Sequence, residues 1–560
     1  MAGGKRDRPS RLVLSTRVAN RKQKPSAGGL NLREANLPPP RPGSLRDRRP
    51  GKRPDSNTLG DRQQTQAQVQ DRTRKSKPNF KHMKMAQSLS PVSWTQRTNV
   101  GSTIEPWSSF DDFELLDCVK EAISKEALGD LATIQPTAVQ RLVIPALTGM
   151  GLKARQKAVS QSRFESFLIA AETGSGKTLS YIIPVMDFLK REEEILKKEE
   201  EEEEEGRGKK LLQEQRKKPD ALFELEGPIV ENRENNGKPQ VVILVPTSEL
   251  VNQVGGVIKS MSHVVKLRSA LISRDFSGVV IRRRLFSGPV DILVSTPHLL
   301  SSLAEDDPRI LSKCSHIIVD EADSLYDRTF SPLTSAIITR AENLKRLVLC
   351  SATIPKSLDR SLRKLYPEMT RLVTPHLHAI PRRVQLSIVD ADAEPYKGNK
   401  PLACADTLHK ISKDESEVGF IKKVIVFVNE RESTATLTSY LQSKGFDAIS
   451  LERDTSNRKE ASVLEYFTGP KTAVGPEVQA KDRMSVLVTT DISSRGIDTK
   501  TVKNVVLYDV PFSTIDFIHR LGRTGRMGRR GQAVILVDKN TNKAWVKDIK
   551  KSMFLGGPLV

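Results

Sequence analysis

The 560-residue sequence has few aromatic residues, few cysteines and no long apolar run, and each shortage excludes a class of protein. Aromatic residues make up 5% and hydrophobic residues 37% of the chain, which is low for a chain that is packed throughout. No apolar stretch approaches the ~20 residues that a membrane helix needs, so we expect no integral membrane association. The four cysteines form no C-x-x-C pair, which argues against a disulfide framework or a zinc ribbon and favours a reducing, intracellular setting.

Positive charge is concentrated at the amino terminus. The formal net charge is +22, and residues 1–100 supply 17 of it, because they hold 23 Lys and Arg but only six Asp and Glu. With so few apolar residues, we expect a disordered basic tail over residues 1–105. A targeting leader, a nucleic-acid-binding arm, a nuclear import signal and a solvated spacer all fit this composition. The first 30 residues, with eight basic residues and Asp7 alone acidic, resemble a transit peptide.

Short apolar runs rich in β-formers recur after the tail and alternate with amphipathic helical stretches. This alternation predicts an α/β fold with parallel sheets covered by helices on both faces. A polar stretch at about 390–415 lies near the start of a second set of runs, so we expect two tandem domains, at 106–378 and 379–550, and a short tail at 551–560. The predicted strands are 167–170, 241–245, 292–294, 316–319, 346–350, 424–428, 485–489, 505–507 and 533–537.

A block of opposite charges interrupts the first predicted domain. Three glutamates stand at 192–194 and seven at 199–205, and lysines and arginines follow up to Lys218. Blocks of this kind are usually solvated, so we place a charged insert at about 191–237 and expect a helix or a loop there.

Residues 171–178, with the sequence AETGSGKT, lie between a predicted strand and a predicted helix over 179–190. Strand, glycine-rich turn, Lys-Thr and helix in this order predict a P-loop. The glycines let backbone N–H groups curl around phosphate oxygens, and the helix N-terminus adds partial positive charge. Lys177 is then expected to reach the β- and γ-phosphates, and Thr178 to ligate Mg²⁺. The expected ATP contacts in this turn are Ala171, Glu172, Thr173, Gly174, Ser175, Gly176, Lys177 and Thr178.

A second signature, HIIVDEAD over residues 316–323, ends a hydrophobic run with three carboxylates. At the carboxyl end of a parallel strand such groups face the ligand crevice. Asp320 suits a Mg²⁺ contact, and Glu321 suits orienting or deprotonating the water that attacks the γ-phosphate. The pair follows Thr178 by 142 residues in the same predicted sheet, and this combination is far more specific than D-E-A-D alone.

Together these motifs resemble those of the DEAD-box RNA helicases, and the resemblance covers about residues 106–548. The resemblance implies two tandem RecA-like domains, ATP and Mg²⁺ as cofactors and RNA as partner. It also implies that ATP and RNA both favour one closed state. Further residues match the family's motifs in order: Phe110, Gln140 and Asp498 for ATP; Pro246, Thr247, Thr296, Pro297, Thr490, Arg495 and Gly496 for RNA; and Ser351, Ala352, Thr353 and His519 for coupling.

The last motif carries Arg520, Arg523 and Arg526 at a spacing of three, so we expect them along one side of a helix or turn. A surface stripe that binds RNA phosphates is one interpretation. In the family, however, the arginines matching Arg523 and Arg526 act as arginine fingers on the γ-phosphate, worth roughly 10³–10⁵ in rate. The resemblance therefore makes the catalytic set Lys177, Asp320, Glu321, Arg523 and Arg526.

The sequence departs from the family mainly where RNA is contacted. Ser248 replaces the usual Arg, and His298-Leu299 replaces the usual Gly-Arg. The segment 452–457 lacks the usual His-Gly start, and the Gly-aromatic pair expected near 133–135 is missing. These changes affect unwinding more than ATP hydrolysis, so the alternative to a helicase is an ATP-gated RNA clamp or assembly scaffold.

Phe110 and residues 136–140 resemble the upstream aromatic residue and the adenine-reading Q motif of the family, in which the Gln140 amide would read the adenine edge. The Q motif and D-E-A-D disfavour a DNA helicase.

With its Arg-rich leader and charged insert, the chain is most similar to the divergent mitochondrial branch of this family in fungi. That resemblance implies a location in the mitochondrial matrix, and the alternative is the nucleus or nucleolus. The implied task is remodelling of structured RNA or RNA–protein complexes, in particular ribosomal RNA during assembly of the large subunit. Ribosome assembly proteins are the implied protein partners, and the core is expected to be monomeric.

Overall fold

A computed structural model describes most of the chain beyond residue 100. Within these described residues, no helix combines the length and the apolar character needed to cross a membrane. The predicted tail lies outside the described part, apart from a few residues. The described residues are 89–90, 100–129 except 102, 134–150, 162–217, 236–451 except 376, 379, 381, 382, 415, 416 and 418, then 463, 466, 467, 469, 472 and 473, and 484–559 except 492–498, 500, 526–528 and 556–558.

The first half of the chain forms a seven-stranded sheet in the order β3-β4-β2-β5-β6-β1-β7, and every described pairing in it is parallel. Its central strands are almost fully buried, which explains why they appear in the sequence as continuous apolar runs. The strands are β1 (Glu165–Ala170), β2 (Val241–Leu244), β3 (Ser269–Ile272), β4 (Ile292–Ser295), β5 (His316–Val319), β6 (Arg346–Ser351) and β7 (Thr370–Val373).

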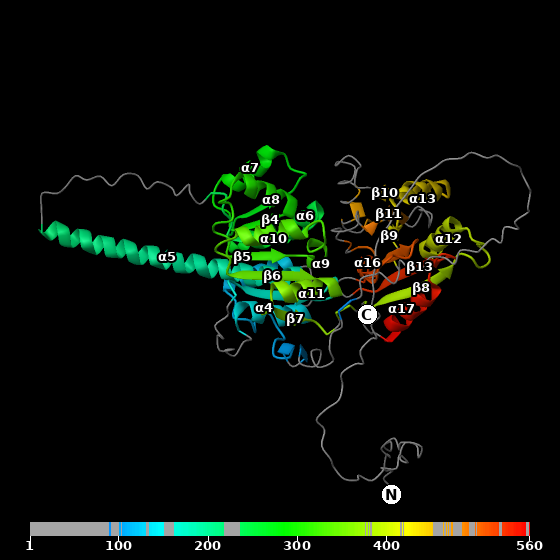
Figure 1. Cartoon of the computed structure of the whole chain (residues 1–560), viewed down its shortest axis with the longest axis horizontal. Helices are drawn as coiled ribbons and strands as arrows, with labels where there is room; N and C mark the ends of the chain where they lie inside the picture. Colours follow the sequence, from blue (N-terminus) through cyan, green and yellow to red (C-terminus); the bar gives the residue numbers. More distant parts are fainter. Residues whose placement is uncertain are drawn as a thin grey trace, which may run out of the picture. The chain divides into compact units, whose positions relative to one another are not determined.

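Helices cover both faces of this sheet (Figure 1). Alternate strand residues enter two separate apolar clusters: Phe167 and Ile169 of β1 belong to one, and Leu168 and Ala170 to the other. We call this sheet with its helices the first lobe. The helices are α3 (Asp117–Ala122), the π-helix η1 (Ile123–Ala127), α4 (Ala138–Thr148), α5 (Lys177–Lys217), α6 (Ser248–Val265), α7 (Gly278–Phe286), α8 (Pro297–Asp306), α9 (Ala322–Leu325), α10 (Ser331–Arg340) and α11 (Lys356–Leu365).

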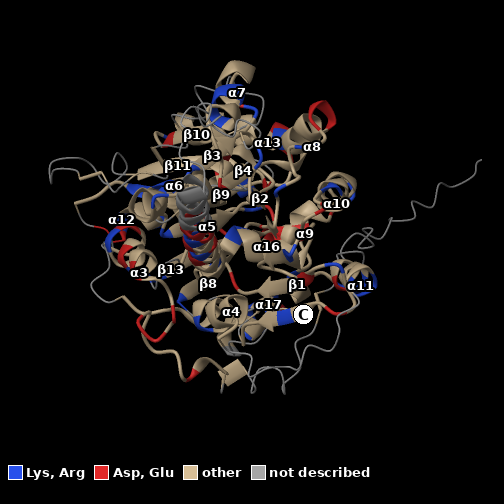
Figure 2. Cartoon of the chain, turned by 90° about the vertical axis from the view of Figure 1, so that its left-hand side faces the viewer, with Lys and Arg blue, Asp and Glu red and all other residues tan. Residues whose placement is uncertain are grey.

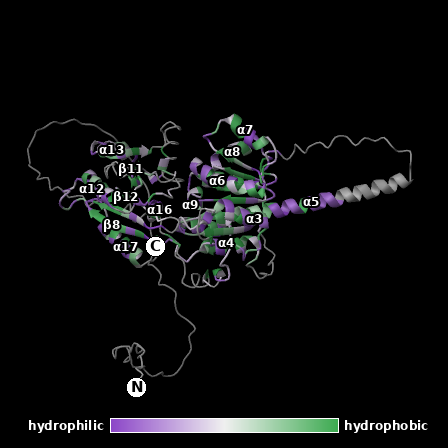
Figure 3. Cartoon of the chain, turned by 180° about the vertical axis from the view of Figure 1, so that it is seen from behind, coloured by the Kyte–Doolittle hydropathy of each residue, from purple (hydrophilic) through white to green (hydrophobic). Residues whose placement is uncertain are grey.

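The charged block is part of helix α5, which begins at the P-loop lysine and continues without interruption to Lys217. Glu193 forms ion pairs on this helix with Lys190 at 2.5 Å and with Lys197 at 2.7 Å. From Arg191 to Glu202 the helix is mostly exposed and hydrophilic, with acidic and basic residues side by side (Figures 2 and 3). Of the two predicted forms of this block, helix and loop, the structure shows the helix.

The second half of the chain forms a six-stranded parallel sheet in the order β10-β11-β9-β12-β13-β8. Its strand residues also alternate between two apolar clusters. We call this sheet with its helices the second lobe, and the two lobes confirm the predicted α/β fold class. Its elements are β8 (Val384–Asp390), α12 (Lys400–Lys413), β9 (Lys422–Phe427), α13 (Arg431–Ser443), β10 (Asp447–Leu451), β11 (Met484–Thr489), β12 (Asn504–Leu507), α16 (Thr514–Leu521), β13 (Gly531–Val537) and α17 (Lys543–Leu555).

Candidate functional site

The predicted P-loop is the turn between β1 and α5. Gly174 and Gly176 have φ angles of 73° and 94°, in the left-handed region that glycine adopts without strain. The Lys177 ammonium lies inside the turn and donates to the backbone oxygens of Ala171 and Glu172, both at 2.9 Å. The turn thus holds its lysine beside the backbone that was predicted to surround phosphate.

Gln140, predicted to read adenine, lies against this turn. Its side-chain oxygen accepts from the Thr137 backbone N–H at 2.8 Å and closes a capping box at the start of α4. Its amide nitrogen lies 3.4 Å from the Gly176 carbonyl oxygen. A Cβ on Gly176 would come within 2.9 Å of that nitrogen, so only glycine leaves room for the contact. The amide therefore joins α4 to the P-loop.

Phe110, the second residue predicted upstream for ATP, belongs to the core of the first lobe. It is 5% exposed, and its ring meets that of Phe113 edge-on at a centroid distance of 6.0 Å. Trp107 stacks on Phe113 from 5.3 Å and is only partly buried. The more accessible aromatic residue of this cluster is thus Trp107, which the motif comparison did not single out.

Asp320 follows β5 at the carboxyl edge of the sheet and is buried. One of its carboxylate oxygens accepts from the Tyr181 hydroxyl at 2.8 Å, and the other accepts from the Glu321 backbone N–H at 2.9 Å. Burial raises the pKa of Asp320, and the hydrogen bond from Tyr181 and the charge of Lys177 oppose that rise. The carboxylate is therefore held in one orientation beside the P-loop lysine.

Glu321 has an unusual backbone for a residue that is not glycine, with φ at 51°. Such left-handed strain costs roughly 1–3 kcal/mol and is concentrated at functional sites. Its Oε2 atom is buried and makes no hydrogen bond within the described residues. Burial raises the pKa of Glu321, whereas electrostatic interactions with His519 and Arg523 lower it. A buried carboxylate oxygen without a donor suits a group that must bind a water.

The residues predicted to bind Mg²⁺ fit a hard cation. Asp320 is a buried carboxylate whose two accepted hydrogen bonds leave further lone pairs, and the unpartnered Oε2 of Glu321 follows next in the chain. Thr178 supplies a partly buried hydroxyl in the first turn of α5. When bound, Mg²⁺ would neutralise the negative charge that develops on the phosphates during hydrolysis.

The coupling residues meet at Asp323, the last carboxylate of the signature. The Thr353 hydroxyl donates to Asp323 Oδ2, and His519 Nε2 of the second lobe lies 3.4 Å from the same oxygen. Ser351 fixes the turn, because its hydroxyl donates to the Thr353 carbonyl at 2.7 Å and accepts from the Thr353 N–H at 3.2 Å. Ala352 lies between them and is 8% exposed. Asp323 thus links the two lobes through one carboxylate.

Arg520 corrects the expectation of a three-arginine stripe. It is 1% exposed and lies inside the second lobe. Its guanidinium donates to both oxygens of Asp491, at 2.7 and 2.6 Å, to the Asp509 carbonyl at 2.7 Å and to Asn429 Oδ1 at 2.7 Å. Helix α16 ends at Leu521, directly after Arg520, so a helical spacing of three does not continue to Arg523. Arg520 therefore holds neighbouring loops together.

Arg523 is near the predicted water-activating residue. It is 7% exposed, and its positive charge lowers the pKa of Glu321. A Cβ on the preceding Gly522 would lie 2.2 Å from the hydroxyl of Thr173 in the P-loop, so this turn of the second lobe packs closely on the first. The other residues predicted here, Arg495, Gly496, Asp498 and Arg526, lie outside the described residues.

The residues predicted to contact RNA in the first lobe start two helices after adjacent strands. Thr247 and Thr296 are the N-caps of α6 and α8, and Pro246 and Pro297 are buried beside them. The preceding strands β2 and β4 pair directly. Two neighbouring helix N-termini present backbone N–H groups and partial positive charge, which suits phosphate oxygens. In the second lobe, Thr490 follows β11 at the matching edge.

Two of the departures from the family lie at these same helix starts. Ser248 is the first residue of α6 and carries no charge. His298 is exposed at the start of α8, and its ring packs edge-on against Phe330 at 5.2 Å. Leu299 is partly buried and packs on the core of the first lobe. The positions that usually carry arginine therefore carry groups without a fixed charge.

Two residues at the site were not predicted to have a role: Tyr181 and Asp323. Tyr181 lies four residues after Lys177, on the same face of α5, and a tyrosine in a buried helix face is a usable signal for a buried acceptor nearby. Asp323 was recognised only as part of the carboxylate cluster. Its role depends on Thr353 and His519, and spacing along the chain does not show that they meet.

Known proteins match almost the whole chain. The DEAD/DEAH box helicase profile matches residues 137–361, and the helicase conserved C-terminal domain profile matches residues 405–528. The protein "ATP-dependent RNA helicase mrh4, mitochondrial" of Sclerotinia sclerotiorum is 47% identical over 97% of this chain and 90% of its own length. Its namesake in Coccidioides immitis is 43% identical over 99% of this chain and 92% of its own length.

Solved structures match the fold of the chain. Dbp5 of S. cerevisiae bound to RNA and ADP BeF3 has a TM-score of 0.55 and 22% identity, covering 80% of this chain and 93% of its own. Mss116p bound to ssRNA and AMP-PNP has a TM-score of 0.56 and 20% identity, covering 83% of this chain and 78% of its own. At these identities the likeness concerns the fold alone.

Proposed function

The chain belongs to the DEAD-box family of ATP-dependent RNA helicases, and on that premise we propose that it uses ATP hydrolysis to remodel structured ribosomal RNA during assembly of the large mitochondrial ribosomal subunit. Relatives that are named mitochondrial ATP-dependent RNA helicases, together with the two helicase profiles, confirm three predictions. These are the family, the ATP-hydrolysing activity and the mitochondrial location. The RNA target and a partnership with ribosome assembly proteins remain proposals, carried by the resemblance to the fungal mitochondrial branch.

One observation carries the proposed mechanism: the meeting of Asp323, Thr353 and His519 beside Glu321, whose Oε2 atom is buried. Glu321 would orient and deprotonate the attacking water, and Arg523 of the second lobe would stabilise charge on the γ-phosphate. Lys177 and the P-loop backbone would hold the phosphates. Because these groups come from both lobes, hydrolysis would require the lobes to close on ATP and RNA.

For the ATP site we propose that the residues 171–178, Gln140, Phe110 and Asp498 surround the nucleotide, and that Thr178 and Asp320 hold Mg²⁺. For RNA we propose the helix starts at Thr247 and Thr296 in the first lobe and Thr490, Arg495 and Gly496 in the second. Binding through phosphates and 2′-hydroxyls gives weak sequence specificity, so the RNA target would be chosen outside this core.

Crosslinking in mitochondria tests the proposed target. Full-length protein is crosslinked to RNA in cells, and the bound RNA is sequenced beside that of a Glu321→Gln variant, which is expected to stay clamped on its substrate. Enrichment of large-subunit ribosomal RNA in both samples is the expected result. Enrichment of messenger or transfer RNA instead would contradict the ribosomal role and leave the ATPase assignment intact.

An ATP-gated RNA clamp with little unwinding is the second candidate, and Ser248 and Leu299, which are uncharged where the family usually has arginine, favour it. A strand-displacement assay beside an ATPase assay separates the two. RNA-stimulated hydrolysis without displacement of a short duplex assigns a clamp, and displacement of the duplex assigns a helicase. A Ser248→Arg variant should strengthen displacement if the missing charge is what limits unwinding.

For the rest of the chain we propose the domain boundaries 106–378 and 379–550, a monomeric core and a basic tail over residues 1–105 with a leader in its first 30 residues. The charge of the tail supports a leader and non-specific RNA binding alike. A fluorescent protein fused to residues 1–100 should enter mitochondria. Cytosolic or nuclear fluorescence would contradict the leader.

A further inference from the structure

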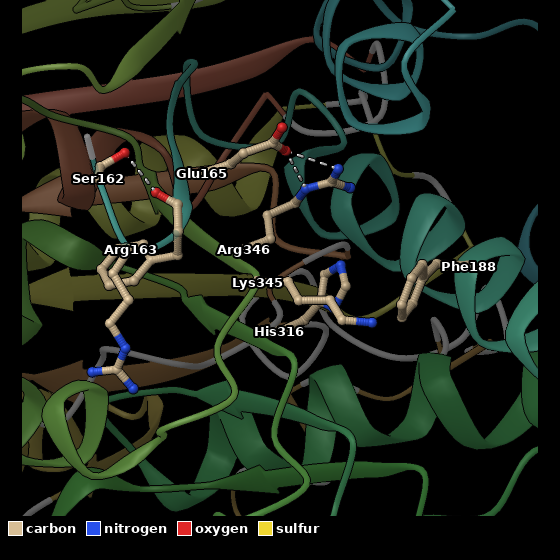
Figure 4. A pocket seen from close by; sticks show the side chains of 8 residues that line it. Ser162, Arg163, Glu165, Phe188, His316, Lys345 and Arg346 are labelled. Atoms are coloured by element: carbon tan, nitrogen blue, oxygen red, sulfur yellow. Dashed lines mark hydrogen bonds and ion pairs between the residues drawn. The ribbon is translucent and has the colours of Figure 1, made fainter. Parts of the chain in front are cut away.

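A pocket lies at the edge of the first sheet where strands begin, opposite the edge that carries the P-loop and Asp320. It has a volume of about 360 Å³. It is lined at the starts of β1, β5 and β6, by residues such as Glu165, His316 and Arg346, and by Phe188 of α5 (Figure 4). Its size is in the lower part of the range for small-molecule sites. The proposed mechanism uses none of these residues.

One wall of the pocket is aromatic and neutral. The rings of Phe188 and His316 lie 4.2 Å apart between centroids, with a tilt of 45°. Burial and the charges of Arg346 and Lys345 lower the pKa of His316 to about 3, so its ring is uncharged at neutral pH.

The hydrogen bonds of His316 are compatible with a proton on Nδ1. The Ser315 hydroxyl lies 3.2 Å from the Gln240 carbonyl oxygen and 2.9 Å from His316 Nδ1. When the Ser315 proton goes to Gln240, the Ser315 oxygen accepts from Nδ1–H and the lone pair of the ring is on Nε2. In that tautomer Nε2 is an acceptor for an N–H donor beside an aromatic wall.

The other walls are positively charged. Arg163, Lys345 and Arg346 line the pocket, and Glu165 is the single acidic residue of the lining. Arg346 is held by Glu165 at 3.0 Å and by the Leu147 carbonyl at 2.7 Å. Lys345 pairs with Glu192 at 2.9 Å, yet its side chain is 64% exposed and extends toward the Phe188 ring (Figure 4).

A smaller adjoining hollow of about 240 Å³ shares Lys345 and adds Lys313. Burial and, to a smaller extent, the charge of Lys238 lower the pKa of Lys313, so lysines contribute to this hollow beside the acidic Glu192. Lysine with arginine provides the donors that phosphate oxygens prefer.

We propose that this pocket binds a nucleotide, with the base against Phe188 and His316 and the phosphate on Lys345. An exocyclic amino or ring N–H of the base would donate to His316 Nε2. Aromatic stacking with charge-assisted phosphate contacts is how proteins bind single nucleotides of RNA. The same chemistry would accept a free mononucleotide, and the experiment distinguishes these two sources. This inference does not depend on the ribosomal target proposed above.

Photocrosslinking with the full-length protein tests the pocket. One arm uses 4-thiouridine 5′-monophosphate, and the other uses a single-stranded RNA 12-mer with 4-thiouridine at its 5′ end. Crosslinks to peptides containing Phe188, His316 or Lys345 are expected. Crosslinks in both arms assign a mononucleotide site, and crosslinks with the 12-mer alone assign RNA. No crosslink to these peptides in either arm overturns the proposal.

Variants of exposed lysines provide the control. Lys345→Ala should reduce crosslinking at the pocket about tenfold, as expected for one lost charge-assisted hydrogen bond. Lys364→Ala removes an exposed lysine of α11 that lies outside the pocket lining and should leave crosslinking unchanged. Both variants should keep RNA-stimulated ATP hydrolysis. Equal crosslinking in Lys345→Ala and the wild type, or competition by poly-glutamate but not by the mononucleotide, would contradict a nucleotide site.

Discussion

Replacing Arg520 with alanine should destabilise the second lobe rather than only slow hydrolysis. The guanidinium makes four hydrogen bonds of 2.6–2.7 Å from a position that is 1% exposed, and they join Asp491, Asp509 and Asn429. Removing one partner of a buried ion pair typically costs about 3–5 kcal/mol. The Asp491 side chain is 25% exposed and can regain water, so we expect the lower end, about 3 kcal/mol.

Hydrogen exchange followed by mass spectrometry measures the loss of stability separately in each lobe. A local measurement is needed because unfolding of a two-lobed chain is not a single two-state transition. Amides of β9 and β12, which flank Asn429 and Asp509, should lose protection in Arg520→Ala, whereas β2 and β5 of the first lobe should not change. The control is Arg363→Ala, which removes an exposed arginine from the partly buried Asp359. Asp359 keeps Arg371 as a partner, so this change should cost at most about 1 kcal/mol. Equal protection in the two variants would refute the buried role of Arg520.

Three further predictions concern the first lobe. Lys177→Ala should weaken ATP binding, whereas Glu321→Gln should still bind ATP and remain bound to RNA. A nucleotide titration measures this, and equal loss of ATP binding in both variants would contradict these roles. Tyr181→Phe removes the 2.8 Å donor to Asp320, so nucleotide binding should need a higher Mg²⁺ concentration, and an unchanged requirement would show that the hydroxyl does not position the carboxylate. His316 has a folded-state pKa of about 3 against 6.5 when unfolded, so its contribution to stability is complete above pH 6.5 and is lost as the pH falls toward 3. Urea unfolding should therefore show a loss of about 1 kcal/mol from this group between pH 6.5 and 5.5, and His316→Gln should remove that part of the slope.

The sequence predicts the inner strands well and the outer ones poorly, for a physical reason. All nine strands that the apolar runs predict lie inside the sheets, where both neighbours pair and both faces are covered. The four strands that were missed are the edges of the sheets, β3 and β7 in the first and β8 and β10 in the second. Their residues alternate or are half-exposed, as in Val384–Asp390, so no continuous apolar run marks them.

In the candidate site, too, the sequence predicts some features and misses others. Local sequence signatures located the P-loop turn, the strand before Asp320 and the helix starts at Thr247 and Thr296, because the conformation of each depends on residues that are neighbours in the chain. Contacts between distant segments were not predictable by spacing. Arg520 looks like one of three equivalent arginines in the sequence, yet its partners lie 29 and 91 residues away and hold it inside the lobe.

The central claim is that hydrolysis needs groups from both lobes, and Arg523→Ala tests it most directly. The measurement is the rate of ATP hydrolysis at saturating RNA, with binding of a fluorescent ATP analogue recorded on the same preparation. Loss of one arginine finger is worth roughly 10³–10⁵ in rate, so stimulated hydrolysis should fall to the level seen without RNA while nucleotide binding is retained. Unchanged RNA-stimulated hydrolysis in Arg523→Ala would contradict a site assembled across the two lobes.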